Sequence, residues 1–476
     1  ISLLGLGRIA VASSTPSAPC DTHLNSLTEM MYCKKDRLAG QPETPPTPFP
    51  GVNPIRICIL GGGFGGLYTA LYLQRTLGPK FKNYQIKLVE PKDHFLFTPL
   101  LYELVTGELQ AWEIAPTYQW LLAHTNVEFC QETVSSVDLA NRRVQLQNGE
   151  SLIYDYLVLA VGGETRLDSI PGAVEHASPF RSLADAVQLK ERLRFLEASG
   201  QRKIQVAVVG GGPNGVELAC KLADRLKTRG QVRLIERGDR ILKTFSAASR
   251  AAAYKALQSR GIQVELETGI EAIAAHHLTL AHREKARTVD ADLVLWTAGT
   301  QSLDWVRDLP CQHNPQGQLL TLPTLQLADH PEVLALGDLA AIQSVGRQPI
   351  PATAQAAYQQ ASCAARNLRA LITEKSLLSF RYLHLGEMLT LGTNSAVVWS
   401  FGFTLQGAIA CMIRHWVYLQ RMPTLRHRLR VMGHWLASGL LRRLPTPARQ
   451  PARQAWKRLT RRSRRVVAHY PRRLPY

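Results

Sequence analysis

The chain has 476 residues, of which 45% are hydrophobic and 20% are charged. This length allows two or three domains with their own cores, and the mean hydropathy of −0.10 favours a soluble or peripheral protein. The formal net charge of +19 is concentrated in one segment, because Arg421 to Tyr476 holds 16 Lys and Arg and no Asp or Glu. The other residues carry 40 basic against 37 acidic side chains, which argues against a nucleic-acid-binding body.

The eight cysteines are scattered without any CxxC or CxxxxC pair. This spacing excludes a local redox disulfide and the common zinc patterns, so no metal site is expected, and it fits a reducing compartment. Cys58 lies in an apolar strand and Cys220 in an expected helix, where each is predicted to be a small buried hydrophobic residue.

Residues 1–54 are expected to form a disordered extension that ends in the Pro-rich run Pro42–Pro54. The first 20 residues lack Asp and Glu and are rich in Ser, Ala and Pro, which loosely resembles a targeting peptide. We favour the alternative of an upstream extension, with the true start at Met30 or Met31.

The first informative segment is an apolar strand, Ile55–Leu60, that runs into a Gly-rich turn and a helix. Gly61, Gly63 and Gly66 satisfy GxGxxG: the first allows a tight turn, the second lets the backbone approach a pyrophosphate, and the third lets the helix pack on the strand. The helix N-terminus then favours the phosphate anion. The next strand ends in Glu90, 24 residues after Gly66, where a carboxylate binds ribose hydroxyls.

The pattern is repeated at Ile204–Val209, which leads into Gly210, Gly212 and Gly215 and a second helix. The following strand ends in a second acid, Glu236. Two matches in full strand–turn–helix context predict two dinucleotide-binding domains.

Each half also contains a later apolar strand that ends in small residues, at Tyr154–Gly162 and Asp290–Gly299. Runs of this kind are typical of buried parallel strands. We therefore predict an α/β fold with two Rossmann-like domains, the second inserted into the first.

This order, closed by the apolar strand before Gly337 and Asp338, resembles the two-dinucleotide flavoprotein superfamily. The resemblance implies FAD at the first turn and NADH or NADPH at the second. It implies an FAD-binding domain at 55–170 and 324–380 and an NAD(P)H-binding domain at 171–323. The residues expected to bind FAD are Gly61, Gly63, Phe64, Gly65, Gly66, Glu90, Thr98, Gly162, Gly337 and Asp338, and those expected to bind NAD(P)H are Gly210, Gly212, Gly215, Glu236 and Gly299. Glu236 favours NADH because a carboxylate accepts from a free 2′-hydroxyl and repels a 2′-phosphate, although Arg237 softens this preference.

The segment Pro351–Gln360 resembles the AQxAxQQ motif of type II NAD(P)H:quinone dehydrogenases, which borders the flavin ring and the quinone channel. Gln355 and Gln359 are four residues apart and share a helix face. Neutral amides suit a quinone because they can donate to its carbonyl oxygens without fixing a charge. A polar helix face beside an Ala-rich seam is the alternative interpretation.

The same family resemblance covers 55–440. The stretch His94–Pro99, which contains Thr98, looks like the family's segment beside the flavin. The stretch Gly107–Pro116 looks closest to a cyanobacterial and plastid branch of the family. Members of this branch are linked to reduction of the demethylated naphthoquinone precursor of phylloquinone. Glu217 corresponds to a family carboxylate near the nicotinamide that orients NAD(P)H or relays protons. A first-turn helix acid favoured by the dipole is the alternative.

The C-terminal region is predicted to dock on a membrane rather than to cross it. Met388–Ile413 lacks charge, but Gly392 to Ser395 break the run, which favours a hairpin followed by a helix from about Leu405. A second helix has leucines on one side and arginines around the remainder, as an interfacial helix requires. We expect docking helices at 381–440 and a basic tail at 441–476 that binds anionic lipid, with no specific nucleic acid.

The expected location is therefore the cytoplasmic face of a membrane, plasma or thylakoid, with a plastid as one alternative, and a homodimer is compatible with the family. Two other functions stay open from the sequence. One is a soluble FAD-dependent reductase with a protein or small-molecule acceptor. The other is a non-enzymatic nucleotide-sensing or scaffold protein.

Overall fold

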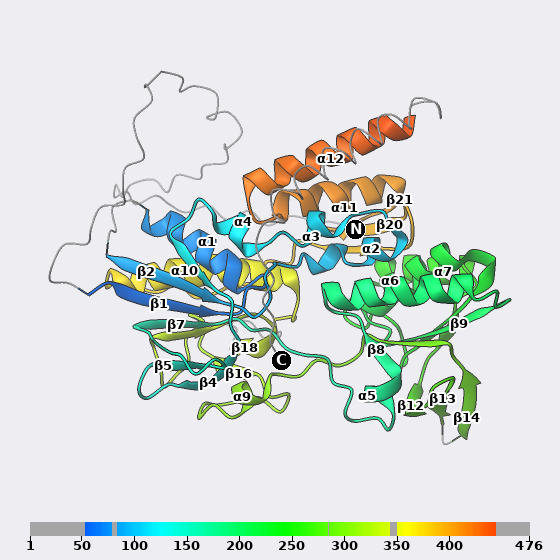
Figure 1. The fold of residues 1–476 in the computed structure, drawn as a ribbon, viewed down its shortest axis with the longest axis horizontal. Helices are drawn as coiled ribbons and strands as arrows, with labels where there is room; N and C mark the ends of the chain where they lie inside the picture. The colour runs from blue at the N-terminus through cyan, green and yellow to red at the C-terminus, as the bar shows by residue number, and fades with distance from the viewer. Residues whose placement is uncertain (1–52, 79–82, 284, 343–349, 444–476) are drawn as a thin grey trace, which may run out of the picture. The chain divides into compact units, whose positions relative to one another are not determined.

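The computed structural model describes residues 53–78, 83–283, 285–342 and 350–443, and the predicted disordered extension lies almost wholly outside them, as does nearly all of the basic tail. Two five-stranded parallel sheets organise the described part of the chain (Figure 1). The first has the order β17-β7-β1-β2-β3. Its strands are β1 (Ile55–Leu60), β2 (Tyr84–Val89), β3 (Val127–Cys130), β7 (Tyr156–Leu159) and β17 (Val333–Ala335).

The second sheet has the order β11-β10-β9-β15-β8. All of its strands come from the chain between β7 and β17, so the second unit is inserted into the first, as the repeated motifs predict. The strands are β8 (Ala177–Pro179), β9 (Ile204–Val209), β10 (Gly230–Ile235), β11 (Gln263–Glu265) and β15 (Leu293–Trp296).

The register of the central strands places their carboxyl ends level. In the first sheet Leu60 pairs with Val89 and with Leu159. In the second sheet Val209 takes the corresponding place, paired with Ile235 and Trp296. These six end residues are all buried, as expected for parallel strands covered on both faces. The loops that follow them therefore meet at one edge of each sheet, where open α/β sheets bind ligands.

Helices cover both sheets. In the first unit α1 (Gly66–Leu77) packs along α10 (Ala354–Ile372), and both lie beside β1 and β2 in Figure 1. The second unit carries α6 (Leu183–Ala198), α7 (Pro213–Leu226) and α8 (Ala247–Ser259), with Cys220 fully buried on α7 and Cys58 buried on β1. The shorter helices are α2 (Tyr102–Thr106), α3 (Ala111–Ile114), α4 (Tyr118–Leu122), α5 (Ala173–His176) and α9 (Asp304–Arg307), and the 3-10 turns are η1 (Thr98–Leu100), η2 (Lys227–Arg229) and η3 (Gly337–Leu339).

Smaller sheets are formed by other segments of the two units. The antiparallel ones are β4 (Val134–Asp138) with β5 (Arg143–Leu146) and β6 (Ser151–Ile153), and β12 (Thr268–Ile273) with β13 (His277–His282) and β14 (Lys285–Asp290). The parallel pair is β16 (Leu319–Thr321) with β18 (Ala340–Ile342).

The C-terminal region forms a three-stranded antiparallel sheet followed by two helices. The strands are β19 (Glu387–Thr390), β20 (Ala396–Ser400) and β21 (Phe403–Gly407), and the helices are α11 (Ala408–Arg421) and α12 (Leu425–Arg443). The predicted helix start near Leu405 is wrong, because Leu405 pairs with Val398 in the sheet and α11 begins only after Gly407, which has φ 78°. Across the described residues, no helix combines the length and hydropathy needed to span a membrane.

Candidate functional site

The first Gly-rich turn has three positions with different steric demands. A Cβ on Gly61 would lie 2.4 Å from the Ala160 carbonyl oxygen, and one on Gly66 would lie 1.8 Å from the Gly61 oxygen. A Cβ on Gly63 would meet nothing within 4 Å. The outer glycines are therefore required by the turn itself, whereas Gly63 faces open space where a pyrophosphate can approach the backbone.

The second turn has the same arrangement. A Cβ on Gly215 would lie 1.8 Å from the Gly210 oxygen, and Gly210 has φ 108°, whereas Gly212 is open. Each turn leads directly into a helix of more than ten residues, and the first turn of such a helix leaves backbone N–H groups without an intrahelical partner, although Pro213 at the start of α7 has none. Both turns thus suit the phosphates of a dinucleotide.

The two predicted ribose-binding acids hold equivalent places. Glu90 Oε2 accepts from the Gly62 N–H at 2.8 Å, and Glu236 Oε2 accepts from the Gly211 N–H at 2.6 Å. Each carboxylate therefore grips the middle of its own glycine turn. A carboxylate has about four acceptor sites, so both acids keep capacity for ribose hydroxyls.

Aromatic side chains support the first turn. The half-buried Phe64 ring lies 5.3 Å from the rings of both Phe95 and Phe97 in edge-to-face contacts. Tyr118 donates its hydroxyl to the Gly62 carbonyl at 2.7 Å, a contact that the sequence analysis did not foresee. Leu336 restricts position 65 to glycine, because a Cβ on Gly65 would lie only 2.8 Å from the Cδ1 atom of Leu336.

The segments that follow β7 and β15 are joined by backbone hydrogen bonds. Gly162 and Gly299 follow β7 and β15 with φ 70° and 74°, and both are open. Two residues after each, Glu164 and Gln301 exchange backbone hydrogen bonds at 2.9 and 3.0 Å. The predicted small residues after both strands thus lie on adjoining segments.

Gly337 and Asp338 form the turn η3 after β17. The Gly337 N–H donates to Gln360 Oε1 at 2.7 Å, which ties this turn to α10. Asp338 Oδ2 accepts from Arg181 Nη2 at 3.0 Å, and both side chains are about one third exposed. Gln360 ends the predicted AQxAxQQ segment but was not singled out, and Arg181 was not predicted, because only the tertiary fold brings both side chains to this turn.

The two glutamines predicted to face a quinone have different partners. Gln359 forms two hydrogen bonds with the backbone of Leu383, donating to its carbonyl at 2.8 Å and accepting from its N–H at 3.0 Å. Gln355 only accepts, from the Tyr382 hydroxyl at 2.9 Å. Within the described part of the chain, the Gln355 amide nitrogen therefore has both N–H groups available as donors, whereas one of the two N–H groups of Gln359 is already used.

Glu217 is the fifth residue of α7, just after a first turn that holds no acidic residue, and it is 6% exposed. Its Oε1 accepts from the Thr390 N–H at 2.7 Å and lies 3.5 Å from Arg414 Nη2. Burial raises the pKa of Glu217 to about 7, despite the opposing effect of Arg414. This carboxyl can therefore take up or release a proton near neutral pH.

Arg414 joins Glu217 to the first unit. Its fully buried guanidinium pairs with Glu103 of α2, donates to the Pro99 carbonyl at 2.6 Å and lies 4.8 Å from the Tyr418 ring centroid. Burial acts to raise the pKa of Glu103, but Arg414 and Lys221 outweigh it, so this pKa is lowered. Thr98, predicted beside the flavin, is half-buried and immediately precedes Pro99.

Sequence reasoning missed this buried network. Arg414 and Glu103 are 311 residues apart, and nothing local marks their pairing. One signal was present, because Arg414 is the first charged residue after the uncharged run Met388–Ile413. A lone charge that ends such a run needs a partner when it is buried.

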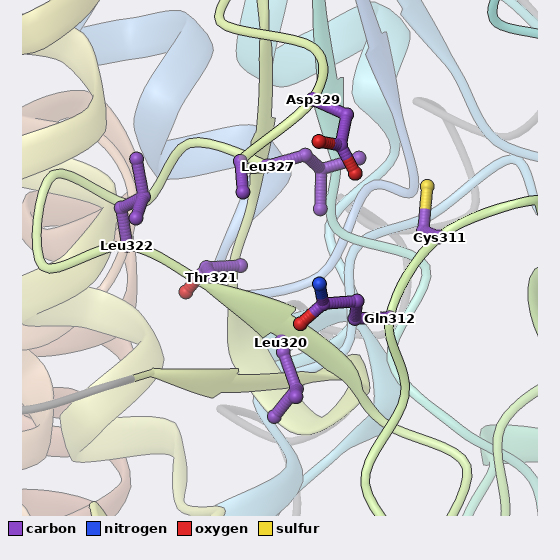
Figure 2. A pocket seen from close by; sticks show the side chains of 8 residues that line it. Cys311, Gln312, Leu320, Thr321, Leu322, Leu327 and Asp329 are labelled. Atoms are coloured by element: carbon purple, nitrogen blue, oxygen red, sulfur yellow. The ribbon is translucent and has the colours of Figure 1, made fainter.

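Two cavities among the described residues lie away from both glycine turns. One of about 20 Å³, roughly the space of one water molecule, adjoins β16 and includes the buried, unpartnered Thr321 hydroxyl (Figure 2). Another opens at the amino ends of β1 and β7, the edge opposite the turns, and includes Ile55 and Tyr156. Neither is lined by a residue of the two glycine turns.

The sequence of the chain is similar to known oxidoreductases. The family model of the pyridine nucleotide-disulphide oxidoreductases matches residues 55–361. A demethylphylloquinone reductase from Synechocystis sp. is 46% identical over 81% of this chain and 96% of its own length. The alternative NAD(P)H-ubiquinone oxidoreductase C1, chloroplastic/mitochondrial, from Arabidopsis thaliana is 38% identical over 80% of each chain.

Similarity in fold extends to proteins with more distant sequences. The structure of NDH2 from Plasmodium falciparum in complex with NADH superposes with a TM-score of 0.73 at 19% identity, covering 81% of this chain and 98% of that one. A sulfide:quinone oxidoreductase from Aquifex aeolicus superposes with a TM-score of 0.68 at 20% identity, covering 78% and 91%. These likenesses concern the fold alone.

Proposed function

Because the chain belongs to the pyridine nucleotide-disulphide oxidoreductase family, and within it to the type II NAD(P)H:quinone oxidoreductases, we propose that it is an FAD enzyme that oxidises NADH and reduces a membrane naphthoquinone or plastoquinone without pumping protons. The first candidate acceptor is demethylphylloquinone, because the 46% identical relative is named as its reductase. FAD, when bound, would accept the hydride of the nicotinamide and pass two electrons to the quinone.

The observation that carries the proposal is the matched steric pattern of the two glycine turns. In each turn the first and third glycines are blocked by backbone or side-chain atoms while the second is open, and an acid bonds to the residue between the first and second. We assign FAD to the turn with Glu90 and the nicotinamide nucleotide to the turn with Glu236. Gly162, Gly337 and Asp338 would hold the remainder of FAD, and Gly299 the remainder of the nicotinamide nucleotide.

The donor preference follows from Glu236. Its carboxylate would accept from the 2′-hydroxyl of NADH and repel the 2′-phosphate of NADPH. Arg237 is exposed and forms no ion pair with a carboxylate of the described residues, so it does not neutralise Glu236 directly. We therefore propose NADH as the preferred donor.

The acceptor site would use Gln355 and a proton from Glu217. The amide nitrogen of Gln355 can donate to a quinone carbonyl oxygen, whereas the bonds of Gln359 to Leu383 suit it to hold the segment after α10. Reduction of a quinone to a quinol takes up two protons. Glu217, with a pKa near 7, can hold a proton at the working pH.

The C-terminal helices would bring the enzyme to the quinone. The exposed apolar residues of this region are Phe401, Phe403, Leu405, Ile409, Met412, Trp416, Leu425, Leu429, Met432 and Leu436. Side chains of this kind on amphipathic helices are what an interfacial docking surface requires. We propose peripheral docking on anionic lipid at the cytoplasmic face of a plasma or thylakoid membrane, with a homodimer compatible with this arrangement and no specific nucleic-acid partner.

The test uses the full chain purified in detergent under air-free conditions. A flavin spectrum that NADH bleaches and a naphthoquinone restores is the expected result. Bleaching without recovery would overturn the quinone assignment and favour a soluble reductase with another acceptor. A colourless protein that binds no added FAD would overturn the proposal as a whole.

A further inference from the structure

Two arginines of α12 lie against tryptophans of the first unit. The guanidinium carbon of Arg430 is 4.6 Å from the centroid of the Trp112 ring and 5.7 Å from that of Trp120. That of Arg426 is 5.2 Å from the Trp120 centroid. The arginines are four residues apart and so share one helix face, and contacts at these distances are attractive cation–π interactions.

Hydrogen bonds beside Trp112 hold α12 against the first unit. Glu113, 1% exposed, lies beside Trp112 on α3 and accepts from Trp435 Nε1 at 2.7 Å. The Glu113 carbonyl oxygen lies 2.8 Å from His427 Nε2. Both bonds tie α12 to α3, so the helix that carries the arginines is held against the segment that carries Trp112. A pre-ordered site loses less side-chain entropy when it binds.

The charges of this pair are not neutralised by the described residues. Arg426 and Arg430 are exposed, and neither forms an ion pair with a carboxylate of the part of the chain that the structure describes. The one polar contact of Arg426 found there is with His124 Nε2 at 3.1 Å. The guanidinium carbons lie over the tryptophan rings, and the exposed groups keep N–H donors for an anion. A planar fork of this kind matches the oxygens of a phosphate.

The neighbouring side chains indicate that the phosphate belongs to a lipid headgroup rather than to a nucleic acid. Leu425 and Leu429 on the same helix are 57% and 53% exposed, and they continue into Met432 and Leu436. When such a stripe enters the acyl region, the flanking cationic residues and tryptophans lie at the depth of the lipid headgroups. A nucleic acid would offer phosphate but nothing to cover the leucines.

We propose that Arg426 and Arg430, held on Trp112 and Trp120, form a binding site for the phosphate of an anionic phospholipid headgroup. The site rests on the proposed membrane docking of α11 and α12. Two positioned arginine side chains would then recognise anionic lipid, in addition to any attraction by the basic tail that follows α12. The tryptophan Trp112 belongs to the stretch Gly107–Pro116, so the feature that resembles one branch of the family acquires a physical role.

The experiment measures binding of the full chain to vesicles of phosphatidylcholine, with and without phosphatidylglycerol, by flotation at constant ionic strength. The test variant is Arg426→Gln/Arg430→Gln. The matched control is Arg192→Gln/Arg194→Gln on α6, which removes the same charge. It also removes a similar aromatic contact, because the guanidinium carbon of Arg192 lies 5.6 Å from the centroid of the Phe195 ring. The test variant should lose about 30-fold in partitioning to the anionic vesicles, since each charge near the surface contributes about 1 kcal/mol, and the control should lose less than about twofold.

A third variant, Trp112→Leu/Trp120→Leu, keeps both charges and removes the rings that position them. It should still lose several-fold in preference for phosphatidylglycerol. Equal losses in test and control variants, or wild-type binding by the tryptophan variant, would overturn the proposal in favour of diffuse charge attraction. Stronger binding of the wild type to an oligonucleotide than to anionic vesicles, abolished in the test variant, would also overturn it. NADH oxidation with a water-soluble quinone in detergent tests the proposed function separately, so the two failures are distinguishable.

Discussion

Arg414 Nη2 of α11 lies 3.5 Å from Glu217 Oε1 of α7, and the same guanidinium pairs with Glu103 of α2. Three helices from three parts of the chain thus meet at one buried arginine. Glu103 Oε2 and Arg414 Nε have no hydrogen-bond partner within the described residues. The network is therefore sensitive to any change in the charge of its carboxyls, because an unbalanced buried charge is costly.

Glu217→Gln should remove a pH dependence of stability between about pH 5 and 8. Burial raises the pKa of Glu217 to about 7, so its stabilising contribution is present below its ordinary pKa of 4.5 and is lost as pH rises through 7. The lowered pKa of Glu103 acts in the opposite sense and only at acid pH, below 4.5. Urea unfolding of both proteins at several pH values gives the comparison. The exposed Glu191→Gln is the control, and parallel pH profiles of wild type and Glu217→Gln would contradict the assignment.

Substitution of the open and the blocked glycines should have separable effects. Gly63→Ala leaves the fold intact, because its Cβ meets no atom, but it obstructs the proposed pyrophosphate and should weaken FAD binding by about tenfold, as overpacking of about 1–3 kcal/mol implies. Gly66→Ala should lower both FAD content and the melting temperature, because its Cβ would lie 1.8 Å from the Gly61 oxygen. The ratio of flavin to protein absorbance and thermal unfolding measure the two effects.

The second turn provides the matched control. Gly212→Ala should raise the KM for NADH and leave FAD content unchanged. If Gly212→Ala released FAD, or if Gly63→Ala kept it, the assignment of the two cofactors to the two turns would have to be reversed or abandoned.

Local patterns predicted the fold because each strand–turn–helix unit is specified within about thirty residues. Gly61 and Gly66 are needed by their own turn, and the strand before them is a continuous apolar run. The contacts of Arg414 and Arg430 could not be predicted in this way, since they depend on how α11 and α12 pack on segments some three hundred residues earlier. The start of α11 was misplaced for a related reason: Leu405 fits a helical stripe, but pairing with β20 decides its structure.

Glu236→Gln should change the donor preference. Loss of a charged acceptor for a ribose hydroxyl costs about 1.5–3 kcal/mol, which corresponds to roughly a ten- to hundredfold rise in KM for NADH. The ratio of kcat/KM for NADPH to that for NADH should increase, because the repulsion of the 2′-phosphate is removed. Glu90→Gln, the equivalent change in the first turn, should lower FAD affinity without this shift. A shift in donor preference for Glu90→Gln, or none for Glu236→Gln, would contradict the assignment.

The two glutamines of α10 should separate acceptor binding from stability. Gln355→Ala removes an available amide donor and should raise the KM for quinone by about three- to tenfold, as expected for one neutral hydrogen bond. Bleaching of the flavin by NADH should proceed at the wild-type rate. Gln359→Ala breaks both bonds to Leu383 and should mainly lower the melting temperature. Stopped-flow measurement of the two half-reactions, together with thermal unfolding, distinguishes these effects. A quinone defect confined to Gln359→Ala would show that the wrong glutamine has been assigned to the acceptor. Tyr382→Phe removes the hydroxyl that donates to Gln355. This variant tests whether Gln355 needs the bond from Tyr382 to be positioned for the quinone.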